Sequence, residues 1–115
     1  MTDLEYDPVR PSTRAELTVR LQSGDPEVVA RALYSAARYE QDWKWVQDLC
    51  LEYLDSPAKT LRWAAATCLG DLAAFRQPLQ TEIVIPALER AAKDPEITDP
   101  AQFSLSMVKQ FLLPS

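Results

Sequence analysis

The chain has 115 residues, a length that suits one domain with a useful hydrophobic core. Hydrophobic residues make up 47% of it and only 2 residues are glycine, a balance that favours an all-α protein over a sheet protein or a disordered chain. The formal net charge of −5 argues against direct nucleic-acid binding, which needs a basic surface to engage phosphates, and permits a basic protein partner.

Two features of the sequence bear on the cellular compartment. No run of about 18 apolar residues occurs, so we expect no membrane contact. The first ten residues, MTDLEYDPVR, are acidic where a secretory signal would be basic and then apolar. We therefore expect a soluble, cytoplasmic protein. Cys50 and Cys68 fall on apolar helix faces, which predicts buried, reduced thiols; a disulfide or a reactive cysteine is the alternative.

Helix signals repeat along the chain after an extended lead-in at residues 1–11. Six helices are expected at about residues 13–22, 26–40, 42–54, 57–75, 81–93 and 101–113. Thr13 and Glu16 form a capping box for the first helix. Ser56 is predicted to cap the fourth, with Pro57 as its first helical residue. Pro86 falls inside the fifth helix, where it should remove one backbone hydrogen bond and bend the helix.

The fourth helix has apolar residues on two opposite sides. One stripe has the three- and four-residue spacing of a core face: Leu61, Ala64, Ala65, Cys68, Leu72 and Phe75. The opposite stripe is small except for its tryptophan: Trp63, Ala66, Gly70, Ala73 and Ala74. Small residues let another helix approach closely, so we interpret the second stripe as the contact with a second neighbouring helix. A partner protein docking there is the alternative.

The helices group into three pairs, at about residues 13–40, 42–75 and 81–113. The separation from Pro26 to Pro57 is 31 residues and that from Pro57 to Pro95 is 38, close to the period of helical repeats. The segment LRWAAATCLGDLA resembles the second helix of a HEAT repeat, and IPALERAAKDPE resembles a first helix followed by its Asp-Pro turn. This resemblance implies one HEAT-like domain over residues 1–115: an α-solenoid-like stack of about three antiparallel helix pairs.

A narrower resemblance concerns function. The segment GDPEVVARALYSAARYEQDWKWVQDLCLEYLDSP followed by LRWAAATCLGDLA is similar to the small HEAT-like proteins found beside bacterial polymorphic toxins, including immunity proteins of contact-dependent growth inhibition. The resemblance implies a cytoplasmic, non-enzymatic protein that binds and blocks a cognate toxin domain, and toxins of that kind are often nucleases. We expect the protein to be monomeric when free. The rivals are a structural or adaptor protein without a toxin partner and a lyase-like HEAT enzyme, for which we find no catalytic residues.

The residue types offer little for catalysis. The chain has no histidine, so it lacks the usual general base near neutral pH and the usual metal ligand. Gly24 and Gly70 stand alone among helix residues, which rules out a phosphate-cradling glycine loop built from them. We therefore expect no enzymatic activity, no metal and no cofactor.

The third helix carries the first candidate for partner binding. Trp45 stands at the rim of its apolar stripe beside Asp48 and Glu52. A tryptophan bordered by carboxylates suits a basic partner surface, as an anchor with an electrostatic surround. The alternative is that Trp45 packs under a neighbouring helix or under the N-terminal segment.

The second helix carries the other candidate. Tyr34 stands between Arg31 and Arg38, and second helices line the concave side of a HEAT-like stack, so this set, with Arg62, is expected to face a groove. The alternative is that Glu27 pairs with Arg31 along the helix and the remaining side chains are solvated.

Overall fold

The computed structural model describes residues 13–75 and 77–113, so the lead-in expected at residues 1–11 lies outside the described part. All regular structure in these residues is helical, which confirms the all-α prediction. The helices are α1 (Arg14–Leu21), α2 (Pro26–Tyr39), α3 (Trp43–Tyr53), α4 (Lys59–Ala74), α5 (Thr81–Ala91) and α6 (Thr98–Leu112). None of these helices has the length and apolar character needed to cross a membrane.

The predicted starts of the first three helices are confirmed. The Thr13 hydroxyl accepts from the Glu16 N–H at 3.1 Å, while the Thr13 N–H donates to the Glu16 carboxylate at 2.9 Å, which completes the capping box of α1. Asp25 caps α2, and Asp42 caps α3 by accepting from the Trp45 N–H. These local pairings are readable from sequence because donor and acceptor are three residues apart or fewer.

The predicted start of α4 is wrong by two residues. Ser56 does not cap a helix; its hydroxyl accepts from the Ala58 N–H at 3.1 Å within a local turn. The Ser56 and Pro57 carbonyl oxygens accept from the Arg62 guanidinium at 3.0 and 3.2 Å. The turn therefore has its own stabilising bonds, and α4 begins only at Lys59.

The start of α6 also differs from the prediction, in the opposite direction. The helix begins at Thr98, three residues before the expected position, because the Thr98 hydroxyl donates to the Ala92 and Asp94 carbonyls and ties the chain into an early turn. Pro100 then lies in the first turn, where a missing N–H costs no helical bond. In α5 the helix continues through Pro86, as the sequence predicted, and ends at Ala91.

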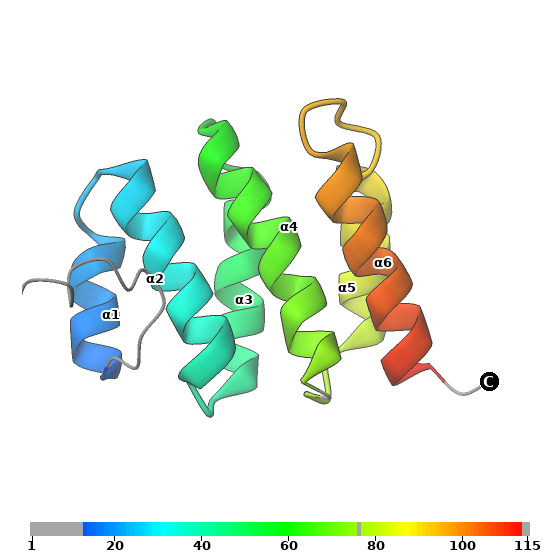
Figure 1. Ribbon diagram of the computed structural model, residues 1–115, viewed down its shortest axis with the longest axis horizontal. Helices are drawn as coiled ribbons and strands as arrows, with labels where there is room; N and C mark the ends of the chain where they lie inside the picture. The colour runs from blue at the N-terminus through cyan, green and yellow to red at the C-terminus, as the bar shows by residue number, and fades with distance from the viewer. Residues whose placement is uncertain (1–12, 76, 114–115) are drawn as a thin grey trace, which may run out of the picture.

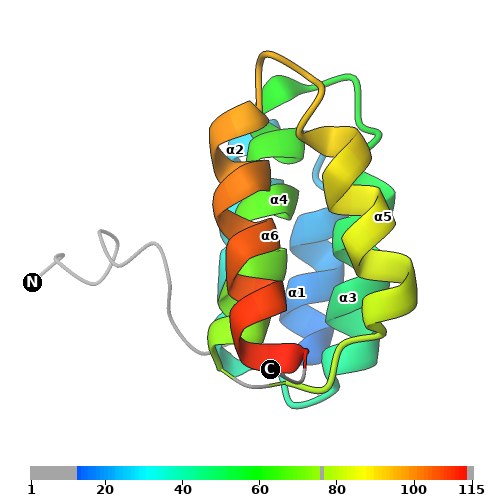
Figure 2. The same cartoon turned by 90° about the vertical axis from the view of Figure 1, so that its right-hand side faces the viewer.

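The six helices lie in two layers. Figure 1 shows α2, α4 and α6 side by side, and Figure 2, turned by 90°, shows α1, α3 and α5 as a second layer to the right of them. We call these the front layer and the back layer. Within the front layer α4 packs against both α2 and α6. In the back layer, by contrast, α3 and α5 do not pack closely against each other. The molecule is elongated, with extents of 47 × 27 × 22 Å.

The small residues of α4 do contact a second helix, as predicted. Ala66, Gly70 and Ala73 are buried, and the Ser104 hydroxyl of α6 donates to the Ala66 carbonyl at 2.6 Å. A Cβ on Gly70 would lie 2.3 Å from the Ser104 Oγ, so only glycine allows this approach. Trp63 is the exception: the sequence assigned it to the contact with a second neighbouring helix, but it is 40% exposed and lines a hollow between α2 and α4 instead.

The opposite face of α4 forms the core, as predicted from Leu61 to Leu72. Phe75 follows the last residue of α4 and is 46% exposed, so it leaves that stripe. Cys50 and Cys68 are both buried and free, which confirms the expectation of buried thiols. Burial, together with the Cys50 thiol, raises the pKa of Cys68 well above its ordinary value and keeps its thiol protonated.

Candidate partner-binding site

A hollow of about 800 Å³ opens on the front layer between α2 and α4. Its volume lies in the range typical of binding sites. We call it the α2–α4 hollow. It is lined by Glu27, Ala30, Arg31, Tyr34, Lys59, Thr60 and Trp63.

Helical spacing places two aromatic and two basic side chains around this hollow. Arg31 and Tyr34 are three residues apart on α2, and Lys59 and Trp63 are four apart on α4, so each pair shares one helix face. The Lys59 ammonium lies 5.9 Å from the centroid of the Trp63 ring, at the outer limit of a cation–π contact. The hollow thus combines an exposed tryptophan with a half-buried tyrosine and two cations.

Tyr34 is held more firmly than Trp63. Its ring packs against the buried core, and the side chain is half-buried. Burial is the largest cause of the raised pKa of Tyr34, which keeps the hydroxyl protonated and able to donate at neutral pH. The tyrosine therefore forms the α2 side of the hollow and is held by the core, whereas Trp63 extends from α4 toward solvent.

The local charge of the hollow is opposite to that of the whole chain. Arg31 and Lys59 supply two positive charges against the single carboxylate of Glu27, although the chain as a whole carries −5. The Glu27–Arg31 ion pair weighed from the sequence is absent among the described side chains. Arg31 is exposed and free to meet a partner.

Arg62 does not face the hollow, contrary to the expectation from sequence. Its Nε lies 3.2 Å from the Asp94 carboxylate, and its Nη2 donates to the Glu96 carboxylate. The Arg62 side chain is only 15% exposed. The guanidinium therefore links the turn before α4 to the segment between α5 and α6, more than thirty residues away along the chain.

Arg38 lies one helical turn beyond Tyr34 and attracts Asp71 of α4 rather than lining the hollow. Burial raises the pKa of Asp71 above its ordinary value, and the attraction of Arg38 offsets only part of this. The carboxylate is therefore ionised at neutral pH in a place that disfavours its charge.

Asp71→Asn should consequently stabilise the protein at pH 7 and leave its stability nearly unchanged at pH 3. Because the pKa of Asp71 is higher in the folded chain than in the unfolded chain, the group favours folding while it is protonated, and this contribution is lost as the pH rises through the folded-state pKa. Thermal unfolding of both proteins at the two pH values tests this. A lower Tm for the variant at pH 7 would mean that the attraction to Arg38 outweighs the burial.

The candidates on α3 lie in the back layer, on a different face from Tyr34 and Arg31. Trp45 is half-buried, and the Arg14 guanidinium of α1 lies 4.1 Å from the centroid of its ring. Trp45 thus packs under a neighbouring helix, the arrangement weighed as the alternative. Asp48 pairs with Lys44 at 2.8 Å, and Glu52 is exposed. The part these three residues play in binding stays a prediction.

Sequence reasoning missed Trp63 and Lys59 as members of the site. Trp63 was assigned to the stripe of Ala66, Gly70 and Ala73 because it shares their helix face. Its size was the available clue, since a tryptophan cannot fit where two backbones approach as closely as α4 and α6 do at Gly70.

Comparisons with protein-family models, with curated proteins and with solved structures gave no match. Among the residues that the structure describes, no group of three or more His, Cys, Asp or Glu side chains could hold a metal ion. The site is therefore interpreted from its own geometry and from the sequence.

Proposed function

We propose that this protein is an immunity protein that binds and neutralises a cognate toxin domain by protein–protein contact, without catalysis. One observation carries the proposal: an exposed tryptophan, a half-buried tyrosine and two basic side chains surround a single hollow. Tryptophan, tyrosine and arginine are the residues most enriched among those that dominate binding energy at protein interfaces. The resemblance of the sequence to immunity proteins supports the choice of a toxin as partner.

We also propose that the fold is a HEAT-like α-solenoid of three antiparallel helix pairs. Support comes from the pairing of α1 with α2, α3 with α4 and α5 with α6 along one long axis, with the second helix of each pair in the front layer (Figure 1). The α2–α4 hollow then lies on the face formed by the second helices, the face that such repeat proteins use for binding.

The proposed partner is a toxin domain such as a nuclease, which presents an acidic or neutral patch to the basic α2–α4 hollow and has basic regions elsewhere on its surface. A net charge of −5 would steer this protein toward those basic regions over long range. Within the interface, Tyr34 and Arg31 act at the hollow and Arg38 at its edge, while Trp45, Asp48 and Glu52 form a second proposed contact area on the back layer. We propose a cytoplasmic protein that is monomeric when free.

Trp63→Ala should weaken the toxin complex at least tenfold, about 1.4 kcal/mol, because it removes the exposed large hydrophobic side chain of the hollow. The test co-expresses the protein with the product of the gene immediately upstream, scores rescue of growth and measures Kd by calorimetry. The matched control is Phe103→Ala, which removes a 66% exposed aromatic side chain outside the hollow and should leave Kd unchanged.

Two different failures are distinguishable. Absence of both a complex and growth rescue with the wild-type chain would end the immunity proposal. A complex that Trp63→Ala and Phe103→Ala affect equally would instead place the interface away from the α2–α4 hollow. Thermal unfolding of both variants must show a nearly unchanged Tm, since each side chain is largely outside the core.

An adaptor protein without a toxin partner is the second candidate function. It is favoured by a specific observation: the back layer has a hollow of its own, separate from the α2–α4 hollow. Two hollows on opposite layers suit a scaffold that holds two partners together. An adaptor would bind proteins other than a toxin and would give no rescue of growth.

A further inference from the structure

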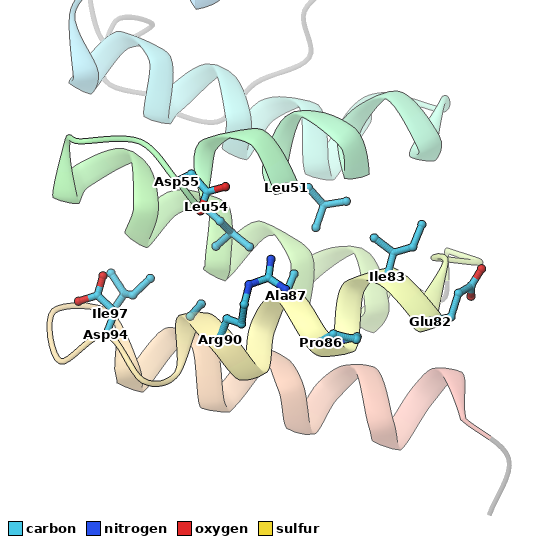
Figure 3. A pocket seen from close by; sticks show the side chains of 11 residues that line it. Leu51, Leu54, Asp55, Glu82, Ile83, Pro86, Ala87, Arg90, Asp94 and Ile97 are labelled. Atoms are coloured by element: carbon cyan, nitrogen blue, oxygen red, sulfur yellow. The ribbon is translucent and has the colours of Figure 1, made fainter.

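The second hollow runs between α3 and α5 on the back layer and has a volume of about 470 Å³ (Figure 3). It exists because α3 and α5 are tied at one end and pack little elsewhere. The tie is made by Gln47 of α3, whose amide donates to the Gln80 side chain at 2.9 Å and accepts from the Gln80 N–H at 2.8 Å. We call this hollow the α3–α5 groove.

Aliphatic side chains form part of the walls of the groove, and charged side chains form much of the rest. Leu51 comes from the C-terminal half of α3 and Leu54 from the residue that follows this helix, and Ile83 and Ala87 come from α5. Ile83 is 44% exposed, although isoleucine is among the residues most often buried. An apolar side chain from a partner would remove this exposed surface from water, which is the main favourable term in protein association.

The two ends of the groove are acidic. In Figure 3 Asp55 lies at one end and Glu82 at the other. Neither carboxylate has an ion-pair partner among the described side chains. Asp94 also lines the groove, but it is already engaged by Arg62. Asp55 and Glu82 are therefore the carboxylates available to a partner.

Pro86 adds a further acceptor at the Glu82 end. Proline has no N–H, so it cannot donate to the carbonyl oxygen four residues earlier, which is that of Glu82. Glu82 is exposed, and its carboxylate and its main-chain carbonyl are both acceptors at this rim of the groove. A donor-rich group such as a lysine or arginine side chain matches this end.

Arg90 sets the charge pattern between the ends. Figure 3 shows its side chain reaching from α5 toward α3, at a point between Asp55 and Glu82 that is nearer to Asp55. A partner cation would be repelled there and attracted at Asp55 and Glu82. Glu82 and Ala91 are nine residues apart on α5, a distance of about 14 Å along the helix axis, so the groove can hold two to three turns of a partner helix.

We propose that the α3–α5 groove binds a basic amphipathic helix of a protein partner, with an aliphatic side chain between Leu51 and Ile83 and a lysine or arginine at each end. The partner helix carries its basic residues on Asp55 and Glu82 and a neutral or acidic residue opposite Arg90. This surface is independent of the α2–α4 hollow and does not rest on the assignment of a toxin.

The probe is a fluorescein-labelled 14-residue helical peptide that has leucines on one face, lysines near both ends and glutamine between them. A matched peptide carries glutamate in place of each lysine. Fluorescence anisotropy with the full chain should show binding of the lysine peptide and none of the glutamate peptide. Two-dimensional NMR should place the largest amide shifts on Leu51, Ile83 and their neighbours.

The deciding variant is Asp55→Asn with Glu82→Gln, which should weaken binding of the lysine peptide at least tenfold. The matched control is Glu89→Gln with Asp99→Asn, which removes the same charge from exposed positions outside the groove and should change Kd less than twofold. Equal weakening by both pairs would show attraction to net charge alone and overturn the proposal. Absence of binding to the wild type, or shifts centred on the α2–α4 hollow, would overturn it as well.

Discussion

Replacing Gly70 by valine is expected to lower the free energy of unfolding by about 3 kcal/mol, at the upper end of the range for overpacked cores. The backbone of α4 comes so close to α6 at this point that an added Cβ would lie 2.3 Å from the Ser104 Oγ, 2.9 Å from its Cβ and 3.0 Å from its Cα. Rotation of the serine side chain cannot relieve the contact with its backbone, so the two helices must separate. Chemical denaturation measures the loss.

Gly70→Ala provides the sharper control because its two effects have opposite signs. Alanine is favoured over glycine inside a helix by about 1 kcal/mol, so the same substitution at an uncrowded helical position stabilises a protein. At position 70 we expect net destabilisation instead. In a double-mutant cycle, Ser104→Gly should cost less in the Gly70→Ala background than in the wild type. A stabilised Gly70→Ala variant would contradict the close approach of α4 and α6.

The contact between α4 and α6 also shows how much of the fold the sequence could predict. The small side chains of Ala66, Gly70 and Ala73 recur on one helix face, and that spacing was sufficient to predict a second neighbouring helix. The starts of α4 and α6 were not predictable in the same way. The hydroxyls of Ser56 and Thr98 can either cap a helix or form a hydrogen bond within a turn. In the folded chain both bond within a turn, and tertiary packing rather than local sequence determines which of the two forms.

The candidate site was predictable only in part for a related reason. Tyr34 and Arg31 share a face of α2, so their proximity follows from helical spacing alone. Their neighbours Lys59 and Trp63 come from another helix pair and are brought to them by tertiary packing. Arg62 was misassigned because the partners that turn it away from the hollow, Asp94 and Glu96, lie beyond the end of α5.

Gln47→Ala should lower the free energy of unfolding by about 3 kcal/mol, because it leaves both a cavity and unpaired polar groups behind. Gln47 is fully buried, and it is the residue that ties α3 to the start of α5. Its loss removes the acceptor of the Gln80 N–H and the donor to the Gln80 side chain. The α3–α5 groove should widen, which NMR shifts at Ile83 would report.

Gln80→Ala is the matched control. It removes only the side-chain acceptor at 2.9 Å and keeps the bond from the Gln80 N–H to Gln47 at 2.8 Å, so we expect a loss of about 1 kcal/mol. The backbone bond is the stronger constraint, since it fixes the position of the first residues of α5 and not just a side chain. Equal losses for the two variants would show that the side-chain pair, rather than the backbone bond, holds α3 and α5 together.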